Sequence, residues 1–537
     1  MVKKIDLLIL GSGPSGVTVA RQLIRAGLKV TLLDNGYHSD PKVCEVESHE
    51  TLWDFRTKTS FLPTPDDKKQ EKRKSNQSPK FSVRSFFPIY RDFSKLSSIK
   101  AEGMKVVGSH AVGGLSNIWG AGCPTLHDTL AKNWPFGKEE LIRSYNEVAP
   151  FIGLSGEENK ELFSNMILKE NLQKPLELAA PMRLAFEKYS AQNNSDADKE
   201  FFLARANNAV SSEKTSTQSG CSYCGACLYG CKQNSIFNSA YSIKELKKSG
   251  LVKHISGKCI TSLSVNKSGH YKLYGFDSSS SNRTEDLLYE TKTLFLAAGT
   301  ITTNLLIHRL LNNFDKVINL HVHPSQAFAF VAPQLLGSSV EKNFFALSGL
   351  NYSLKENTDE IAFGTLFSAM GISAEEFIQR LKFSRPTATQ ITKFTQPAMV
   401  LANCYLNQRL ANVELRIKEN SAEIHGEFKK EFRAVANYTK NKIIKNLRKF
   451  GLYYLPGTSK IAQLGSDAHI IGGLVSHKNR KRPILSKEGN LIGHPGIWIA
   501  DGSAIYSTGN RNPTFTIMAW ANTVAKCFLR EKKEKSG

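Results

Sequence analysis

The sequence predicts an α/β fold in which a parallel sheet flanked by helices is joined to a discontinuous second domain built on an antiparallel sheet with helices. Two sets of observations lead to this fold class. Near the N-terminus, an apolar run at 5–10, a helix pattern at 17–26 and a second apolar run at 29–33 make a βαβ unit. Further along, strand patterns at 320–333, 399–405, 412–417 and 422–426 predict one antiparallel sheet, and a helix pattern follows at 431–450.

The length and composition are those of a folded protein with several domains. The chain has 537 residues, enough for about three domains or two larger interleaved ones, and 41% of its residues are hydrophobic. Its net charge of +23 favours anionic small molecules, membrane surfaces or nucleic acid without choosing among them. Because no stretch offers about 18 uninterrupted apolar residues, we expect no transmembrane segment. We expect a soluble, cytoplasmic protein.

The turn after the first strand has the glycine spacing of a dinucleotide-binding motif. Gly11 allows the tight turn, Gly13 lets the backbone approach a pyrophosphate, and Gly16 lets the helix pack closely on the strand. The helix N-terminus adds a partial positive charge that attracts phosphate. Asp34 ends the second strand, where its carboxylate can accept a hydrogen bond from a ribose hydroxyl. These residues predict a dinucleotide site but do not decide between FAD and NAD.

A second glycine-rich segment, at 109–122, combines small residues with one large aromatic side chain, so its backbone can lie against a flat ring. Its candidate site residues are Gly113, Gly114, Ser116, Asn117, Trp119 and Gly120. Here the sequence resembles the glucose-methanol-choline family of FAD-dependent oxidoreductases, whose Gly-Gly-x-Ser-x-x-Trp-Gly stretch lines the flavin. Segments 293–300 and 497–519 resemble the family's later motifs and occur in the family's order. The resemblance spans nearly the whole chain.

The resemblance implies a Rossmann-type FAD-binding domain and assigns individual residues to parts of the cofactor. It places Asp501 and Gly502 against the ribitol and pyrophosphate. It places Pro513 and Thr514 at the pyrimidine end of the flavin ring. Ile260 is expected to contact the adenine through its backbone.

The resemblance also bears on how FAD is held. In some sugar oxidases of the family, a histidine two residues after the serine of the glycine-rich motif attaches the flavin covalently. That position here is Ile118, which cannot form such a bond. We therefore expect noncovalent FAD.

A histidine and an asparagine are the candidate catalytic pair. Oxidation of an alcohol by a flavin needs a base of near-neutral pKa and a group that holds the substrate oxygen. By position in the family pattern, His469 is the base and Asn512 its partner, although Ile470 replaces the family's usual proline. His494 begins a His-Pro-Gly sequence that superficially matches the family better, but it lies directly before the strand at 497–500 and is not assigned a catalytic role.

Four of the nine cysteines are crowded into the loop 220–232. Cys221, Cys224, Cys227 and Cys231 have the spacing of bacterial ferredoxins, which predicts ligands for a 4Fe–4S cluster. Lys232 replaces the proline that usually follows, and the chain shows no second cluster motif. A 4Fe–4S cluster, a structural zinc site and reduced packing thiols therefore stay open. A bound cluster favours a dehydrogenase, whereas without one both oxidase and dehydrogenase chemistry stay open.

The family pattern implies two domains that alternate along the chain. The FAD-binding domain is expected at 1–135, 205–331 and 462–537, and the substrate-binding domain at 136–204 and 332–461. The lysine-rich stretch 63–80 has no apolar period and is predicted to be an exposed insertion without a site.

Together these observations predict FAD-dependent oxidation of an alcohol CH–OH group by hydride transfer to flavin N5. A sugar or polyol is favoured because 113–124 resembles the sugar-oxidising branch of the family. The electron acceptor is unknown, and no nucleic-acid partner is expected. Two alternatives stay open: a pyridine-nucleotide-linked electron-transfer flavoprotein that uses the cysteine cluster, and a non-catalytic basic binding protein on a flavin fold.

Overall fold

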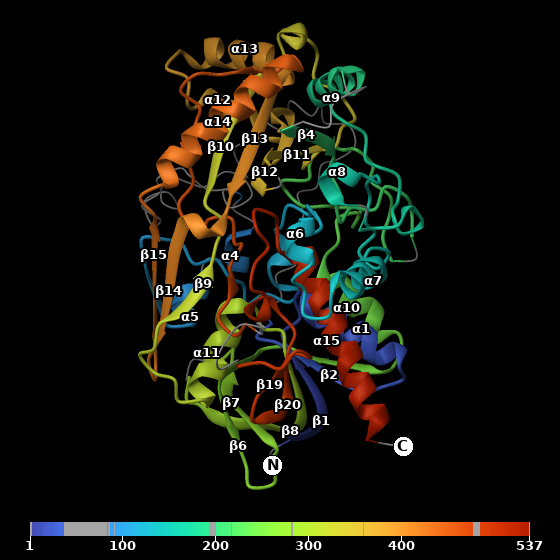
Figure 1. Cartoon of the computed structure of the whole chain (residues 1–537), viewed down its shortest axis with the longest axis vertical. Helices are drawn as coiled ribbons and strands as arrows, with labels where there is room; N and C mark the ends of the chain where they lie inside the picture. The colour runs from blue at the N-terminus through green and yellow to red at the C-terminus, as the bar shows by residue number, and fades with distance from the viewer. Residues whose placement is uncertain are drawn as a thin grey trace.

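The described part of the chain is elongated and has a sheet towards each end. The computed structural model describes residues 3–36, 83, 86–90, 92–164, 166–192, 200–215, 217–280, 283–357, 359–475 and 484–535. The predicted insertion 63–80 lies outside these residues. The N- and C-termini lie at the same end of the molecule (Figure 1). None of the described helices is long and apolar enough to cross a lipid bilayer.

The end that holds both termini is built on a parallel sheet. Its strand order is β19–β20–β8–β1–β2–β5, and every neighbouring pair is parallel except β19 and β20. The bounds are β1 (Lys3–Leu10), β2 (Val30–Leu33), β5 (Val252–Ile255), β8 (Asp286–Leu296), β19 (Asn490–Leu491) and β20 (His494–Ile499). A hairpin of β6 (Lys258–Val265) and β7 (Tyr271–Asp277) extends the sheet from β8. Helix α1 (Pro14–Arg25) joins β1 to β2, so the predicted βαβ unit is confirmed.

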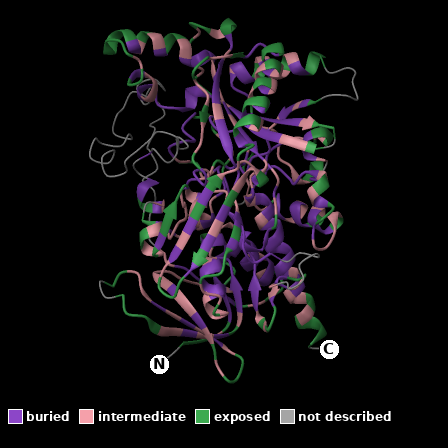
Figure 2. Cartoon of the chain, turned by 60° about the vertical axis from the view of Figure 1, so that its left-hand side comes forward, coloured by how far each residue is buried: buried purple, intermediate pink, exposed green. Residues whose placement is uncertain are grey.

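The opposite end is built on an antiparallel sheet, whose strands are largely buried (Figure 2). Its order is β16–β10–β13–β12–β11–β4, with β17 beside β10. The bounds are β4 (Phe201–Arg205), β10 (Ser325–Val331), β11 (Leu350–Glu356), β12 (Asp359–Ser368), β13 (Met399–Leu406), β16 (Tyr453–Tyr454) and β17 (Lys460–Ile461). Helix α14 (Phe432–Lys449) packs on it, since Gln326 of β10 donates a hydrogen bond to the carbonyl of Ala436. The domain division stays a prediction, although β10, expected within the FAD-binding segment, pairs here with β13.

A third sheet corrects one part of the sequence interpretation. The strands predicted at 412–417 and 422–426 were expected in the same antiparallel sheet as the strand at 399–405, and this is wrong. They pair with each other in a separate sheet, in the order β18–β9–β14–β15–β3. Its strands are β3 (Ile99–Glu102), β9 (Ile318–His321), β14 (Ala411–Ile417), β15 (Ala422–Phe428) and β18 (Ile471–Gly472).

The chain enters and leaves this third sheet at two breaks. Pro324, which has no N–H to donate, separates β9 from β10, and a short 3₁₀ turn at Gln408–Leu410 separates β13 from β14. The third sheet has its own apolar cluster, which includes Ile318, Leu415 and Ile424. Alternation alone shows that a segment is a strand but not which sheet it joins.

Helices cover the three sheets and fill the space between them. Besides α1 and α14, they are α4 (Phe87–Tyr90), α5 (Phe93–Leu96), α6 (Asp128–Ala131), α7 (Lys138–Val148), α8 (Lys160–Phe163), α9 (Ala180–Gln192), α10 (Ser239–Lys247), α11 (Thr300–Leu310), α12 (Ala374–Ile378), α13 (Arg385–Thr395) and α15 (Thr514–Glu534). Helix α15 packs between α1 and α7, and the hydroxyl of Tyr145 lies 2.7 Å from that of Thr516. This packing fixes the N-terminal end of α15, which the site uses.

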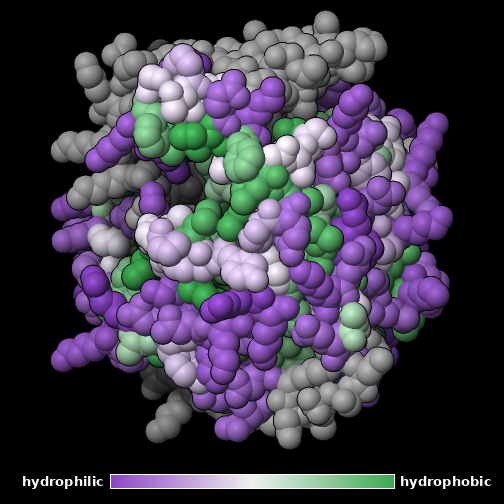
Figure 3. All heavy atoms as spheres, turned by 90° about the horizontal axis from the view of Figure 1, so that it is seen from above, coloured by the Kyte–Doolittle hydropathy of each residue, from purple (hydrophilic) through white to green (hydrophobic). Residues whose placement is uncertain are grey.

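The end of the molecule away from the termini exposes several apolar side chains. Seen from above, hydrophobic residues form a patch bordered by hydrophilic ones (Figure 3). Phe383 and Phe394, next to and on α13, are 61% and 53% exposed, and Leu336 is 37% exposed. Lys382 and Lys393 are exposed beside them. Part of the positive charge of the chain therefore lies at this end.

A buried ion pair ties the C-terminal motif to the antiparallel sheet. Both side chains are almost fully buried, Arg511 at 1% and Glu360 of β12 at 4% exposure. The guanidinium donates to both carboxylate oxygens, at 2.9 and 2.6 Å, and to the carbonyl of Thr125 at 2.9 Å. Burial alone would raise the pKa of the Glu360 carboxyl, but Arg511 holds that pKa below its ordinary value. The pair positions Asn512, the next residue along the chain.

Removing one partner of this pair should destabilise the protein strongly. Glu360→Gln leaves the Arg511 charge buried without a counter-ion, so the free energy of unfolding should fall by about 3–5 kcal/mol at pH 7. Because the folded-state pKa of Glu360 is depressed, the pair stabilises the fold above the unfolded pKa of about 4.3 and loses that contribution as the pH falls through the folded pKa. The difference in unfolding free energy between the native chain and Glu360→Gln, measured by denaturant unfolding, should be smaller at pH 4 than at pH 7.

The exposed carboxylate of Glu158 offers a matched control. Glu158→Gln should change the unfolding free energy by less than about 0.5 kcal/mol at either pH. Equal stabilities of the Glu360→Gln variant and the native chain at pH 7 would contradict the role given to the ion pair.

Candidate active site

The glycine turn after β1 packs as its spacing predicts. A Cβ on Gly16 would lie 1.8 Å from the carbonyl oxygen of Gly11, and a Cβ on Gly11 would lie 2.2 Å from that of Ala297. These two positions therefore hold α1 and the end of β8 against the turn. A Cβ on Gly13 meets no atom within 4 Å, so the turn presents open backbone at the N-terminus of α1. Open backbone at a helix N-terminus is what a pyrophosphate needs.

Asp34 has one carboxylate oxygen available at the end of β2. Its Oδ2 lies 2.9 Å from Nε2 of His254 on β5, whereas its buried Oδ1 has no hydrogen-bond partner among the described residues. An unsatisfied buried acceptor is costly, and a ribose hydroxyl would satisfy it. The glycine turn and Asp34 therefore fit the dinucleotide part of FAD.

The glycine-rich segment runs from this cradle to the candidate catalytic residues. A Cβ on Gly114 would lie 3.5 Å from Cα of Gly13, and a Cβ on Gly122 would lie 3.9 Å from Nδ2 of Asn512. The N–H of Gly113 also donates to Ser12 in the first turn. One short segment thus links the two parts of the predicted site.

The polar side chains of this segment hold it in place. Ser116 accepts a hydrogen bond from the N–H of Ser239 at 3.0 Å. Asn117 donates to the carbonyls of Val112 and Gly114, at 2.8 and 2.7 Å. In addition, the indole N–H of Trp119 donates to the carbonyl of Phe237 at 2.9 Å. Gly120 has no atom within 4 Å of a Cβ position.

The remaining predicted cofactor residues lie at the ends of strands and helices of the fold, and their contacts with FAD stay predictions. The buried carboxylate of Asp501 accepts from the backbone of Gly299 and from Thr303, so it joins the end of β20 to the start of α11. Gly502 begins a 3₁₀ turn directly after it, and Pro513 and Thr514 form the N-terminal end of α15. Ile260 lies on β6, which starts beside Asp34 because Lys258 N–H donates to the Asp34 carbonyl.

The two predicted catalytic residues lie next to each other although 43 residues separate them. Nδ2 of Asn512 is 3.4 Å from Nε2 of His469. Oδ1 of Asn512 is buried and has no hydrogen-bond partner. Helix α15 begins with no side-chain cap, so the Asn512 side chain does not serve as one. Nε2 of His469 and the free amide oxygen of Asn512 can therefore both face a substrate hydroxyl.

Sequence reasoning missed three residues around His469. Nδ1 of the buried His323 lies 3.4 Å from Nδ1 of His469, and Oδ2 of Asp467 lies 3.3 Å from the same atom. The ring of Tyr405 on β13 is 5.3 Å from the His469 ring, centroid to centroid. Asp467, two residues before the predicted base, could have been noticed by that proximity. The sequence gives little indication of a role for His323, which stands only as a histidine before a proline at the end of a strand.

Burial sets the charge of these neighbours. Burial, with a smaller contribution from the nearby His469, lowers the pKa of His323 to about 3, so His323 is neutral at physiological pH. Burial also raises the pKa of the Tyr405 hydroxyl, which keeps it protonated. Burial alone would raise the pKa of the Asp467 carboxyl, but the adjacent His469 holds that pKa below its ordinary value. The site therefore contains one carboxylate among neutral rings.

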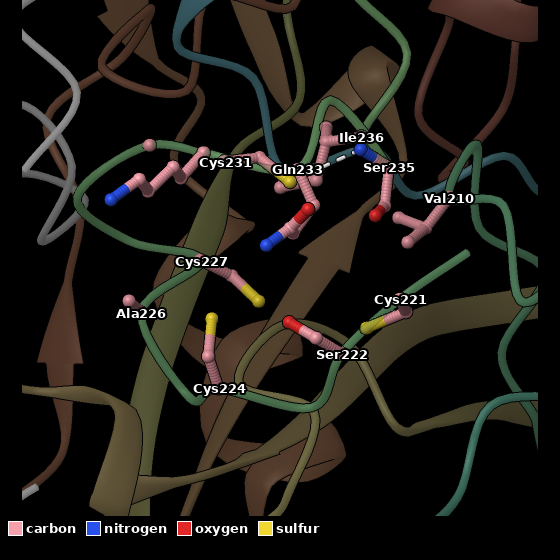
Figure 4. Close-up of a pocket in the computed structure, with 12 residues that line it drawn as sticks. Val210, Cys221, Ser222, Cys224, Ala226, Cys227, Cys231, Gln233, Ser235 and Ile236 are labelled. Carbon is pink, nitrogen blue, oxygen red and sulfur yellow. Dashed lines mark hydrogen bonds between the residues drawn. The ribbon is translucent and has the colours of Figure 1, made fainter. Parts of the chain in front are cut away.

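The cysteine loop forms a tight coil around a small cavity. Its backbone passes through left-handed conformations at Tyr223, Gly225 and Gly230. The four cysteines line one cavity of about 60 Å³, and those at positions 221, 224 and 227 direct their sulfur atoms into the same space (Figure 4). The loop is fastened beside the glycine-rich segment, because the backbone at 207–211 pairs with both.

The sulfur positions suit a cluster better than a single ion. Tetrahedral zinc with Zn–S bonds of about 2.3 Å places thiolates about 3.8 Å apart. No three of the four sulfur atoms, all in the described part of the chain, lie within 4.8 Å of one another. Backbone N–H groups donate to the sulfurs of Cys221 and Cys231, at 3.4 and 3.2 Å, an arrangement that supports thiolate ligands. The donor set therefore fits a group larger than one ion.

Comparisons with known proteins give two informative matches. No family model matches the sequence. The chain is 24% identical over 236 residues to a long-chain-alcohol oxidase of Arabidopsis thaliana, a match that covers 43% of this chain and 23% of that protein. Among solved structures, a variant of the formate oxidase of Aspergillus oryzae, described for its FAD modification, matches with a TM-score of 0.59 at 12% identity and covers 99% of both chains.

The structural match shows the fold alone: this chain shares the fold of that formate oxidase, and the predicted α/β fold class is confirmed. Together, the alcohol oxidase and the formate oxidase support the glucose-methanol-choline family as the one that this chain resembles. The chain spans about a quarter of the length of the curated relative that it matches.

Two glycine substitutions should separate folding from cofactor binding. Gly16→Ala forces a Cβ into the Gly11 carbonyl, so the apo-protein should lose about 3 kcal/mol or more of stability. Gly13→Ala meets no protein atom, so apo-protein stability should change by less than about 1 kcal/mol while FAD affinity falls at least about tenfold. Denaturant unfolding of apo-protein and fluorescence titration with FAD measure the two effects. Unchanged FAD affinity in Gly13→Ala would exclude this turn as the pyrophosphate cradle.

Proposed function

We propose that this protein is an FAD-dependent oxidoreductase that oxidises an alcohol CH–OH group. The observation that carries the proposal is the contact between His469 and Asn512 at the end of a segment that begins on the nucleotide cradle. The names of the two matched proteins, an alcohol oxidase and a formate oxidase, support oxidation of a CH–OH or related donor.

The chemistry divides between the cofactor and two side chains. When bound, FAD supplies the two-electron acceptor that takes a hydride from the substrate carbon. His469 Nε2 accepts the hydroxyl proton, and the loss of both leaves a carbonyl product. The Asn512 amide, whose Oδ1 has no hydrogen-bond partner in the part of the chain that the structure describes, orients the hydroxyl beside that nitrogen. Burial of the surrounding rings excludes water from the reacting groups.

We propose noncovalent attachment of FAD. Ile118 occupies the position where covalent members of the family carry a histidine, and its side chain is buried at 4% exposure. The cradle, the orphaned Asp34 oxygen and the N-terminus of α15 then supply binding through hydrogen bonds and the helix dipole.

For the substrate we propose only a chemical class, and the electron acceptor is not identified. A sugar or polyol is the substrate that the sequence resemblance favours, and the alcohol oxidase relative makes an aliphatic primary alcohol the competing candidate. A cytoplasmic location stays a prediction from composition, as does an electron acceptor of unknown identity. Reduction of the flavin by NADH or NADPH alone would favour the electron-transfer alternative, and FAD binding without turnover of any alcohol would favour the binding-protein alternative.

We propose that Cys221, Cys224, Cys227 and Cys231 hold a 4Fe–4S cluster. Support comes from their ferredoxin spacing, their shared cavity and sulfur separations too large for a single zinc ion. When bound, such a cluster supplies a one-electron relay. Because the cysteine loop lies beside the glycine-rich segment, this favours a dehydrogenase that passes electrons to a carrier.

Replacement of the base should stop flavin reduction without removing the cofactor. In His469→Ala, anaerobic reduction of the flavin by an active alcohol should slow by about 10²- to 10⁴-fold, while FAD content stays at the wild-type level. Stopped-flow absorbance with a panel of sugars, polyols and long-chain alcohols measures both substrate class and rate. The partly buried His494 serves as the matched histidine control, since His494→Ala should keep the wild-type rate. An unchanged rate in His469→Ala would remove His469 from the mechanism.

Metal analysis should identify the occupant of the cysteine loop. Protein purified without oxygen should contain about four iron atoms and four acid-labile sulfides per chain. Cys227→Ser should lose them, whereas Cys527→Ser, at a buried cysteine on α15, should keep them. Zinc in place of iron would support a structural site, and the absence of both metals from native protein would leave packing thiols.

A further inference from the structure

The Nδ1 side of His469 faces two groups to which the proposed reaction assigns no part. Oδ2 of Asp467 lies 3.3 Å from Nδ1 and is buried without a hydrogen-bond partner among the described residues, so it is an acceptor still open to the Nδ1 proton. Nδ1 of His323 lies 3.4 Å from the same ring atom. The other ring nitrogen of His323, Nε2, lies 3.2 Å from the hydroxyl of Thr508, and this contact orients the His323 ring. Asp467 is two residues from His469, whereas His323 and Thr508 come from distant stretches of chain. The arrangement around the ring therefore combines a local contact with contacts made by the tertiary fold.

The position of Asn512 indicates which ring nitrogen carries the proton. An amide NH₂ can only donate, so the contact of Asn512 Nδ2 with Nε2 of His469 requires a lone pair on Nε2. A neutral imidazole then has its proton on Nδ1, where Asp467 and His323 both offer acceptors. This tautomer leaves Nε2 as the basic atom.

The local backbone is shaped to bring Asp467 onto the ring. Oδ1 of Asp467 accepts from the backbone N–H of His469 at 3.2 Å, which orients the second carboxylate oxygen. Ala468, between them, has a φ of 61°, a left-handed conformation that is unfavourable for a residue with a Cβ. Such strain persists only where the surrounding structure stabilises it. Here the left-handed backbone at Ala468 turns the side chains of Asp467 and His469 towards each other.

The other titratable groups around the imidazole are neutral. His323 approaches from the connection between β9 and β10, Tyr405 approaches from β13, and burial keeps both uncharged at physiological pH. His321 lies next to His323 rather than next to His469. In the described part of the chain, Asp467 is therefore the charged group that faces His469.

We propose that Asp467 and His323 are positioning residues for His469. They accept the Nδ1 proton and fix the tautomer, and the Asp467 carboxylate stabilises the positive charge that the ring gains when Nε2 takes the substrate proton. The proton moves from the substrate oxygen to Nε2, while the Nδ1 proton stays between His469 and its two acceptors. The inference rests on the proposed function and adds to it the residues that set the tautomer of His469.

A divalent cation is the competing occupant of this position. One ligand atom from each of His323, Asp467 and His469 lie within 4.8 Å of one another, as they would around a metal ion. A metal on Nδ1 of His469 would require a lone pair there and would place the proton on Nε2. That arrangement would conflict with the Asn512 contact and remove the base, so the geometry favours the hydrogen-bonded arrangement.

The test compares Asp467→Asn with the native holoenzyme. The rate of anaerobic flavin reduction should fall between about 10-fold and 10⁴-fold with little change in the alcohol concentration for half-maximal rate. Loss of the negative charge makes the imidazole a weaker base, so the acid limb of the pH–rate profile should move to lower pH. Asp467→Glu keeps the charge and should keep the limb near its native position. Asp286→Asn, at an exposed aspartate of β8, should match the native enzyme.

A second measurement does not depend on activity. Imidazole ¹⁵N spectra of histidine-labelled apo-protein, with His469 assigned from the spectrum of His469→Gln, should show a protonated Nδ1 and a bare Nε2 at high pH. Asp467→Asn should weaken that preference. This measurement stands even if a variant fails to retain FAD, and metal analysis of the same sample reports any bound cation.

The outcomes separate this inference from the proposed function. Failure of every alcohol to reduce the native flavin would overturn the function. If the native flavin is reduced and Asp467→Asn is reduced at the same rate with the same pH profile, the positioning role is wrong. A proton found on Nε2, or one metal ion per chain held by these residues, would also overturn it.

Discussion

The attachment of the glycine-rich segment at 113–122 is the constraint on which the rest of the site depends. At one end it lies against Gly13 of the nucleotide cradle, and at the other it reaches Asn512. Hydrogen bonds from its polar side chains and its backbone tie it to the chain at 207–211 and 237–239, which flank the cysteine loop. A segment fixed at so many points can hold a flat ring between two domains without closing over it.

Two charged groups that shape the site each have a partner. Arg511 and Glu360 neutralise each other where the C-terminal motif meets the antiparallel sheet, and this holds Asn512 in place. Asp467 faces His469, and the remaining rings around the base are kept neutral by burial. A base in such surroundings can gain a proton with a counter-charge already in position, so little reorganisation is needed.

Local features of the fold could be predicted from the sequence, and features set by distant contacts could not. The glycine turn was predictable because its glycines are required by contacts between residues close in the sequence, such as the close contact between Gly16 and Gly11. The division of strands between the antiparallel sheet and the mixed third sheet was missed because alternation does not encode the strand's partner. The breaks at Pro324 and at 408–410 separate the two sheets. His323 was missed because its importance comes from a contact across 146 residues. The roles of His469, Asn512 and the four cysteines stay predictions that the geometry supports.

The hydrogen bond from the Trp119 indole to the Phe237 carbonyl has a thermodynamic consequence. It joins the segment expected to line the flavin to the segment that follows the last of the four cysteines. A ligand that rigidifies one segment lowers the entropic cost of ordering the other, and this coupling is reciprocal. If the cysteine loop holds the proposed cluster, binding of FAD and binding of the cluster would therefore each increase the affinity for the other.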